Sequence, residues 1–312
     1  MLNEKIKLVA SSRDAFRRGI AERLFYAPYK KSFYNNRNNS CLLLDNVSLN
    51  GKLGGDGLIE RVNKKIIQSG DILEIYEYEH GYLKGFKMPD NEIKGSIDNI
   101  SPKDKEDSRE RALSRAKKDL RRLINSNVGQ YGREFTAKFL TLTFGENITD
   151  IDRANYEFTK FIKRLNYYLF RTKKANLKYT TVIEFQKRGA IHYHTIIYNM
   201  PYVKANDIAN VWENGFIKIN KIDEVDNVGA YVGEYLGQAE KGQGHDPEDD
   251  RLQGRKSYFS SRGLLKPIEI TDKKIVEQVA SALPSQNMTY SADFENEHLG
   301  KISYKQYNIK LI

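Results

Sequence analysis

The stretch VIEFQKRGAIHYHTIIYN, residues 182–199, organises the predicted fold of the chain. β-branched and aromatic residues dominate its two arms, and a short polar break with Gly189 separates them. This pattern predicts a β-hairpin with a longer turn. Because residues two apart in a strand point to the same face, we expect His192 and His194 to lie side by side, with Tyr193 on the opposite face.

Two imidazoles on one strand face can hold a divalent metal ion, and Glu184 on the facing arm can add a carboxylate oxygen. Two nitrogen ligands and one oxygen ligand, with positions left open, suit Mn²⁺, Mg²⁺ or a similar ion that acts as a Lewis acid. The alternative is that both histidines line a half-buried polar face. The chain has only five histidines and two stand together in an otherwise apolar strand, which favours the metal.

The composition points to a polyanionic partner. Lys and Arg total 51 against 41 Asp and Glu, a net charge of +10, which favours nucleic acid before an acidic membrane. The single cysteine, Cys41, excludes a disulfide framework within the chain and fits a reducing cytoplasm. The sequence shows neither the apolar segment of a signal peptide nor a transmembrane run of about 20 apolar residues.

Two segments are expected to contact DNA. In residues 108–126, apolar side chains recur every three or four positions, which predicts a helix with one packed face and a strongly basic remainder. The expected phosphate contacts on this helix are Arg115, Lys118, Arg121 and Arg122, and the alternative is a solvated charged face. Residues 257–267 mix hydroxyl, aromatic and basic side chains, including Arg262 and Lys266, as in segments that face DNA.

Residues 137–240 predict a regular order of elements. The expected order is a strand at 139–144, a helix that begins at a capping box over 149–152, the hairpin, a short helix at 205–213, a strand at 216–222 and a helix at 227–239. Tyr231 and Tyr235 share one face of the last helix. Its glycines make it a poor helix former, which indicates that something approaches it closely, although two core aromatics remain the alternative.

Three of these pieces together resemble the HUH endonucleases, specifically the rolling-circle replication initiators of small phages and plasmids. The pieces are the strand FLTLTF at 139–144, the His192-Tyr193-His194 strand and the tyrosine helix, and the resemblance covers roughly residues 135–240. It implies an α+β fold with a central antiparallel sheet flanked by helices, related to RNA-recognition and ferredoxin-like folds. The predicted order of elements agrees with that fold independently.

The resemblance also implies a mechanism. Tyr231 or Tyr235 attacks single-stranded or hairpin origin DNA, which yields a 5′-phosphotyrosine and a free 3′-OH. His192, His194 and Glu184 hold Mn²⁺ or Mg²⁺. A host helicase and a host DNA polymerase complete replication in the bacterial cytoplasm, without a membrane. In the family a lysine usually follows the tyrosine by three residues; here Glu234 and Gln238 stand there, and Lys241 is the nearest downstream base.

The expected division of the chain has four parts. A β-rich accessory region over 1–100 has short strands expected at 41–44, 71–76 and 82–86. A linker over 101–107 and the basic helix fill 101–134, and the HUH endonuclease domain covers 135–285. A C-terminal extension over 286–312 ends in an edge strand. Three alternatives to the replication initiator stay open. A relaxase or transposase uses the same chemistry, a sheet-based DNA-binding protein or repressor needs no metal pair, and a water-using phosphoesterase needs no tyrosine helix.

Overall fold

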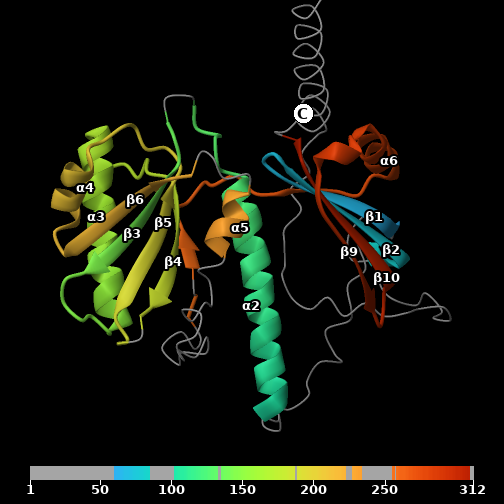
Figure 1. The fold of residues 1–312 in the computed structure, drawn as a ribbon, viewed down its shortest axis with the longest axis horizontal. Helices are drawn as coiled ribbons and strands as arrows, with labels where there is room; N and C mark the ends of the chain where they lie inside the picture. The colour runs from blue at the N-terminus through green and yellow to red at the C-terminus, as the bar shows by residue number, and fades with distance from the viewer. Residues whose placement is uncertain are drawn as a thin grey trace, which may run out of the picture.

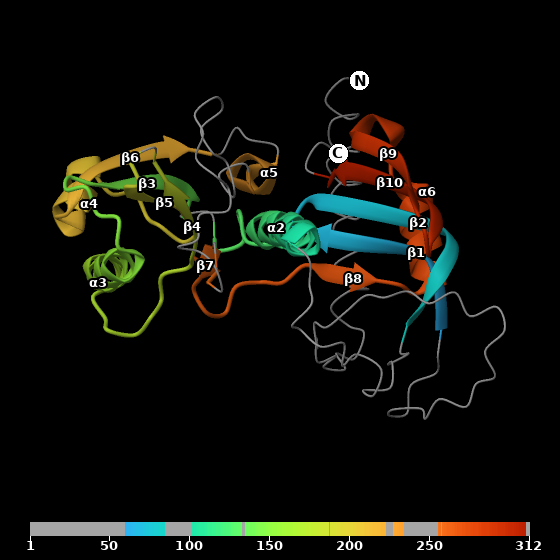
Figure 2. The same ribbon diagram turned by 90° about the horizontal axis from the view of Figure 1, so that it is seen from below.

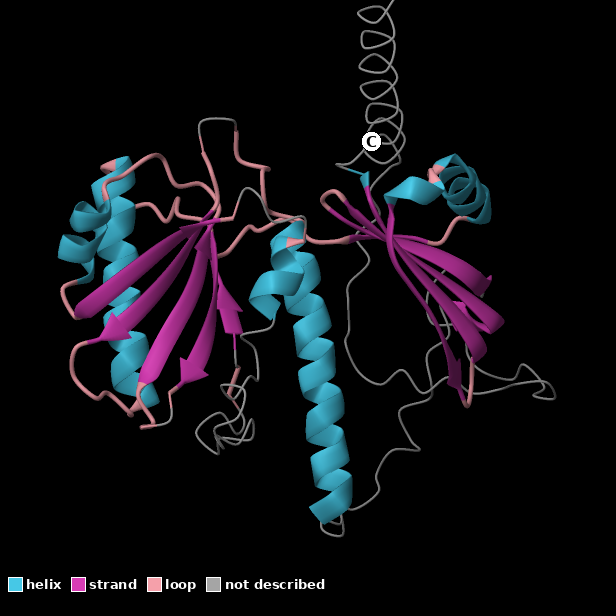
Figure 3. Cartoon of the chain, viewed as in Figure 1, coloured by secondary structure: helices cyan, strands magenta, loops and turns pink. Residues whose placement is uncertain are grey.

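Two antiparallel five-stranded sheets lie on either side of one long helix, α2 (Pro102–Asn125), in the computed structural model (Figure 1). The structure describes residues 60–84, 102–132, 135–186, 188–222, 227–233, 255–256 and 258–309. Figure 2 and Figure 3 show the same arrangement, with α2 between the two sheets. The expected α+β class, with antiparallel sheets flanked by helices, is confirmed.

The first sheet carries His192 and His194 and is called the histidine sheet below. Its strand order is β6 (Gly215–Lys221), β3 (Lys138–Phe144), β5 (Ile191–Ile197), β4 (Tyr179–Phe185) and β7 (Tyr258–Ser260). Its helices are α3 (Ile151–Phe170), α4 (Ala205–Trp212) and α5 (Val228–Gly233). The order from β3 to β6 is the split βαβ pattern of ferredoxin-like folds, as the sequence predicts.

Alternation along the strands builds one core on each face of the histidine sheet. Leu140, Leu142 and Tyr193 pack with Phe158 and Phe161 of α3 on one face. The other face packs against α2 and α5, through a cluster that includes Phe139, Val182, Ile196, Tyr198, Leu120, Ile124, Val228 and Val232. Both faces of the histidine sheet therefore carry a core, and α2 belongs to the second.

Helix α3 begins where the sequence predicts, but its N-cap is one residue later than in the expected capping box over 149–152. Asp150 is the N-cap residue, and its carboxylate accepts a hydrogen bond of 2.6 Å from the Arg153 backbone N–H. The helix ends at Arg171, which adopts a left-handed conformation with φ 52° and donates its backbone N–H to the Tyr167 carbonyl. Because both ends of α3 are fixed, its apolar side chains pack on the sheet.

The second sheet joins segments that are far apart in the chain. Its order is β8 (Ile268–Ile270), β1 (Glu60–Ser69), β2 (Ile72–Lys84), β10 (Gly300–Asn308) and β9 (Met288–Asn296). Helix α6 (Lys273–Ala282) covers one face over Ile66 and Ile75, and a short 3₁₀ helix, η3 (Ser285–Asn287), leads into β9. The other face, with Tyr76 and Tyr304, is turned toward α2.

Three expectations about elements are wrong. Residues 102–107 are the first turns of α2 instead of a linker, because proline is well tolerated at the first position of a helix. The two strands expected at 71–76 and 82–86 are one strand, β2, while the run at 41–44 lies outside the described residues. Residues 300–308 of the C-terminal run form β10, which lies between β2 and β9 instead of at the edge.

In the parts of the chain that the structure describes, none of the helices has both the length and the apolar character required to cross a membrane.

Candidate active site

Two cross-strand rows define the candidate site on the histidine sheet. Glu184 of β4 pairs with His192 of β5, which pairs with Thr143 of β3. In the adjacent row, His194 of β5 pairs with Thr141 of β3. Directly opposed residues in a sheet point to the same face. The predicted pairing of the two histidines with the glutamate on one face is therefore the arrangement in the structure.

His194 is held on three sides. Its Nε2 atom is hydrogen-bonded to Oε2 of Glu184, and its Nδ1 atom lies 3.3 Å from the Thr141 hydroxyl. The ring stacks on Phe139, with the ring centroids 5.7 Å apart. These contacts fix both the position and the plane of the imidazole, with Nε2 directed at the carboxylate.

His192 is buried without such partners. Its Nε2 atom forms no hydrogen bond with any residue that the structure describes, and its side chain is buried. Burial lowers the pKa of His192, the Glu184 carboxylate opposes that shift, and His194 and Arg188 add to it. The resulting neutral imidazole keeps a free nitrogen lone pair. Because buried polar atoms in native proteins nearly always have a hydrogen-bond partner, Nε2 of His192 is a candidate to bind a ligand.

The described residues contain no ready-made cluster of three or more His, Cys, Asp or Glu that could hold a metal ion. As the side chains lie, Glu184 is engaged with His194. These three positions nevertheless supply the two imidazoles and the one carboxylate that the sequence predicts as ligands of a divalent ion.

Tyr231 reaches the same face of the sheet from α5. Its half-buried ring meets Phe139 edge-on, with the centroids 5.7 Å apart. Phe139 therefore contacts both Tyr231 and His194. One aromatic side chain thus contacts both the candidate nucleophile and one histidine of the pair.

A close helix contact holds α5 in place. The Asn227 side chain accepts hydrogen bonds of 2.9 Å from the Ala230 backbone N–H and from Asn125 of α2. A Cβ atom on Gly229 would overlap with the backbone carbonyl of Arg121. The close approach that the glycines of this helix predict is thus the approach of α2 at Gly229.

Tyr235 and Lys241 lie outside the described residues, so Tyr231 is the candidate nucleophile whose surroundings are known.

The basic residues predicted on α2 divide into two groups. Arg115 is exposed. Arg121 and Arg122 donate hydrogen bonds of 3.0 and 2.6 Å to the carboxylate of Glu74, a buried residue of β2. Lys118 lies 4.8 Å above the ring of Tyr76, also on β2. Three of the four therefore contact the second sheet, and their contact with phosphates stays a prediction.

Arg262 and Lys266 are exposed on the connection between β7 and β8. Asn127 anchors this connection, because its side chain bonds both the N–H and the carbonyl of Leu265 at 2.9 Å. Their position is compatible with the predicted contact with DNA, which stays a prediction.

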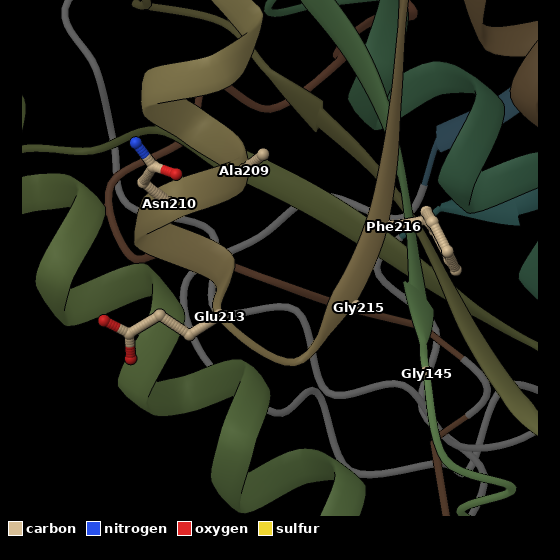
Figure 4. A pocket seen from close by; sticks show the side chains of 6 residues that line it. All are labelled: Gly145, Ala209, Asn210, Glu213, Gly215 and Phe216. Carbon is tan, nitrogen blue, oxygen red and sulfur yellow. The ribbon is translucent and has the colours of Figure 1, made fainter.

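Two exposed residues of β6 extend the rows of the site and were missed from the sequence. Phe216 pairs with Thr143 and Lys218 pairs with Thr141. Phe216 is 76% exposed, and Figure 4 shows its side chain on the side of β6 away from α4. The alternating pattern of β6 indicated a strand, but only its register with β3 places these side chains beside the histidines.

A hollow of about 620 Å³ lies on the α4 side of the same strand, where Gly145 meets Gly215 (Figure 4). Gly215 has φ 147°, and a Cβ atom there would overlap with the backbone of Gly145 and Thr143. The glycine allows β6 to start against the end of β3, which sets Phe216 opposite Thr143.

One comparison with known proteins gives a match. Residues 137–240 match the family model of the replication-associated protein ORF2. The matched part runs from β3 to beyond the described end of α5 and contains both histidines, Glu184 and Tyr231. The match supports a replication-initiator role. Comparisons with curated proteins and with solved structures found no match.

Proposed function

We propose that this protein is a replication initiator that nicks single-stranded origin DNA by tyrosine attack. Under this proposal it remains joined to the DNA through a 5′-phosphotyrosine and leaves a 3′-OH that primes synthesis. One observation carries the proposal: Phe139 touches both His194 and Tyr231, so the histidine pair and the tyrosine share one face of the sheet. The family match over residues 137–240 supports the replication role independently.

Different residues of the site have different roles in the proposed reaction. The Tyr231 hydroxyl oxygen attacks the scissile phosphorus, the bond to the 3′ oxygen breaks, and that oxygen takes a proton to become the 3′-OH. The exposed ring of Phe216 can stack a base beside the site, and Lys218 can contact a phosphate. Because the phosphodiester energy is retained in the tyrosine ester, the same site can later reseal the strand.

A divalent ion fits this site. Nε2 of His192 is a buried atom without a hydrogen-bond partner among the described residues, and Nε2 of His194 faces a carboxylate that can become a shared ligand. His192, His194 and Glu184 would hold the ion, and Thr141 would orient His194 through Nδ1. When bound, Mn²⁺ or Mg²⁺ supplies Lewis-acid polarisation of the scissile phosphate.

The test is incubation of the protein with single-stranded origin DNA and Mn²⁺, followed by a denaturing gel. The Tyr231→Phe/Tyr235→Phe double variant is expected to form no covalent adduct, because the rings remain but the attacking oxygens are gone. Each single variant should retain part of the adduct if both tyrosines act. Tyr202→Phe is the matched control, since Tyr202 is 87% exposed and should behave as wild type.

An adduct formed by the double variant would place the nucleophile elsewhere. DNA cleavage by the wild-type protein without any adduct would instead favour a water-using phosphoesterase, and binding without cleavage would favour a repressor. The metal has its own readout: Mn²⁺ binding, measured by calorimetry, should be lost in His192→Ala, and unchanged Mn²⁺ affinity would contradict the assigned ligands.

A further inference from the structure

A groove of about 850 Å³ is lined by α2, α5 and the second sheet. One wall is basic and belongs to α2, with Lys117, Lys118 and Arg121. The other wall is aromatic and belongs to the sheet, with Tyr290 and Phe294 of β9 among its residues. The proposed nicking chemistry uses none of these five side chains.

The charge of the groove is positive. Among the described residues that line it, none has an acidic side chain. The carboxylate of Glu74, which bonds Arg121 of this wall, is buried and also bonded to Arg122, so one negative charge is shared by two positive ones. Together with Lys117 and Lys118, this leaves a net positive wall that attracts a polyanion.

The aromatic wall is exposed to solvent. Tyr290 is 57% exposed and Phe294 is 46% exposed. The two-residue period of β9 puts both rings on the groove side and puts Asp293 and Glu295 on the opposite face, where Asp293 pairs with Lys301 at 3.2 Å. The two rings stand about 13 Å apart along the strand. Exposed aromatic rings opposite a row of cations are the two components of a single-strand binding groove.

We infer that this groove binds single-stranded DNA, with phosphates on Lys117, Lys118 and Arg121 and bases stacked on Tyr290 and Phe294. The inference extends the proposed function, because the groove begins at α5, the helix of Tyr231. Gly233 of α5 lines the groove, and a Cβ atom there would meet nothing within 4 Å. A strand leaving the site along α5 therefore enters the groove. Stacking on aromatic rings makes the contact independent of base sequence.

The test measures binding without nicking. Fluorescence anisotropy follows a labelled single-stranded oligothymidylate, which contains no origin sequence, with the full-length protein in EDTA. Tyr290→Ala/Phe294→Ala should weaken binding at least about tenfold, since each stacked base contributes about fivefold or more and two rings are lost. Tyr156→Ala/Tyr202→Ala removes two exposed rings elsewhere and should leave binding unchanged.

The basic wall gives a second readout. Lys117→Gln/Lys118→Gln should reduce the slope of log affinity against log salt by about 1.4, because each contact between a lysine and a single-strand phosphate contributes about 0.7. Phe294→Tyr keeps the ring and should keep the affinity, which separates stacking from a folding defect.

Three results would overturn the inference: unchanged affinity of Tyr290→Ala/Phe294→Ala, equal binding of a duplex by the wild-type protein, or a change of oligomeric state in that variant, which would identify a protein interface. Failure of the proposed function looks different. In that case the groove variants still lose oligothymidylate binding, but wild-type protein forms no covalent adduct with origin DNA.

Discussion

Replacing Glu74 by Gln should loosen α2 from the second sheet. The Glu74 side chain is 1% exposed and accepts hydrogen bonds from Arg121, Arg122 and the Tyr304 hydroxyl. Arg122 is itself only 12% exposed, so the substitution leaves a largely buried guanidinium without its counter-charge. Loss of one partner from such a pair costs about 3–5 kcal/mol, and we expect the lower end because Arg121 is 30% exposed and partly hydrated.

The assay is urea unfolding followed by circular dichroism, which reports both sheets. Fluorescence of Trp212, the only tryptophan, reports the histidine sheet alone because this side chain is buried in the core beside α3. Glu74→Gln should therefore shift the dichroism transition more than the fluorescence transition. Glu77→Gln is the matched control: Glu77 lies on the same strand, is 59% exposed and pairs with Lys64, so its loss should cost less than about 1 kcal/mol.

The pH dependence follows from the same contacts. Burial raises the pKa of the Glu74 carboxyl group, but the hydrogen bond and charge of Arg122 and the charge of Arg121 outweigh it and leave the pKa below its ordinary value. The stabilisation is therefore complete above the pKa of an unfolded glutamate, about 4.3, and is lost as the pH falls through the lower folded value. The difference in the free energy of unfolding between the wild-type protein and Glu74→Gln should become smaller below about pH 4. A difference in the free energy of unfolding of less than about 1 kcal/mol at pH 7 would refute the reasoning.

Three further changes test other contacts. Gly229→Ala should displace α5 from the carbonyl of α2 that it overlaps and reduce the yield of the covalent DNA adduct on a gel, whereas Gly233→Ala, which meets nothing, should not. Burial and neighbouring arginines lower the pKa of Lys118 to about 8, so above that pH the unfolded protein binds more protons than the folded protein. The free energy of unfolding should therefore rise from pH 8 to about 10. Denaturation curves of Lys118→Met should not show this rise. Thr141→Val removes the partner of His194 Nδ1 and should weaken Mn²⁺ binding about tenfold in calorimetry, with the melting temperature almost unchanged.

The candidate site could be predicted from local patterns because its geometry is local. The two-residue period of a strand sets His192 and His194 on one face, and a short hairpin brings Glu184 opposite them. The tyrosine helix was predicted on the same grounds, through a four-residue spacing. The pattern could not predict that Phe139 contacts both parts, because the contact between α5 and β3 joins segments about 90 residues apart.

The role of α2 could not be predicted, because its partners are remote. Helical spacing separates Arg121 and Arg122 from the apolar stripe, but it does not indicate what covers them. Their partner, Glu74, belongs to a hairpin about 50 residues earlier, which pairs with β10 more than 200 residues later. The strand β9 was missed for a related reason: its side chains are exposed on both faces, so it lacks the apolar alternation that marks a half-buried strand.

The pairing of β2 with β10 has a consequence for the order in which the protein is made. Ribosomes release β1 and β2 first, then the whole βαββαβ unit, and only afterwards the strands β8, β9 and β10 that complete the second sheet. Nascent chains thus hold a hairpin with an unpaired edge while the histidine sheet folds, a state that exposes strand edges to aggregation. In a chain arrested after Ser260, amides of β3 and β5 should be protected from hydrogen exchange while those of β2 exchange freely, so the candidate site would form before its groove exists.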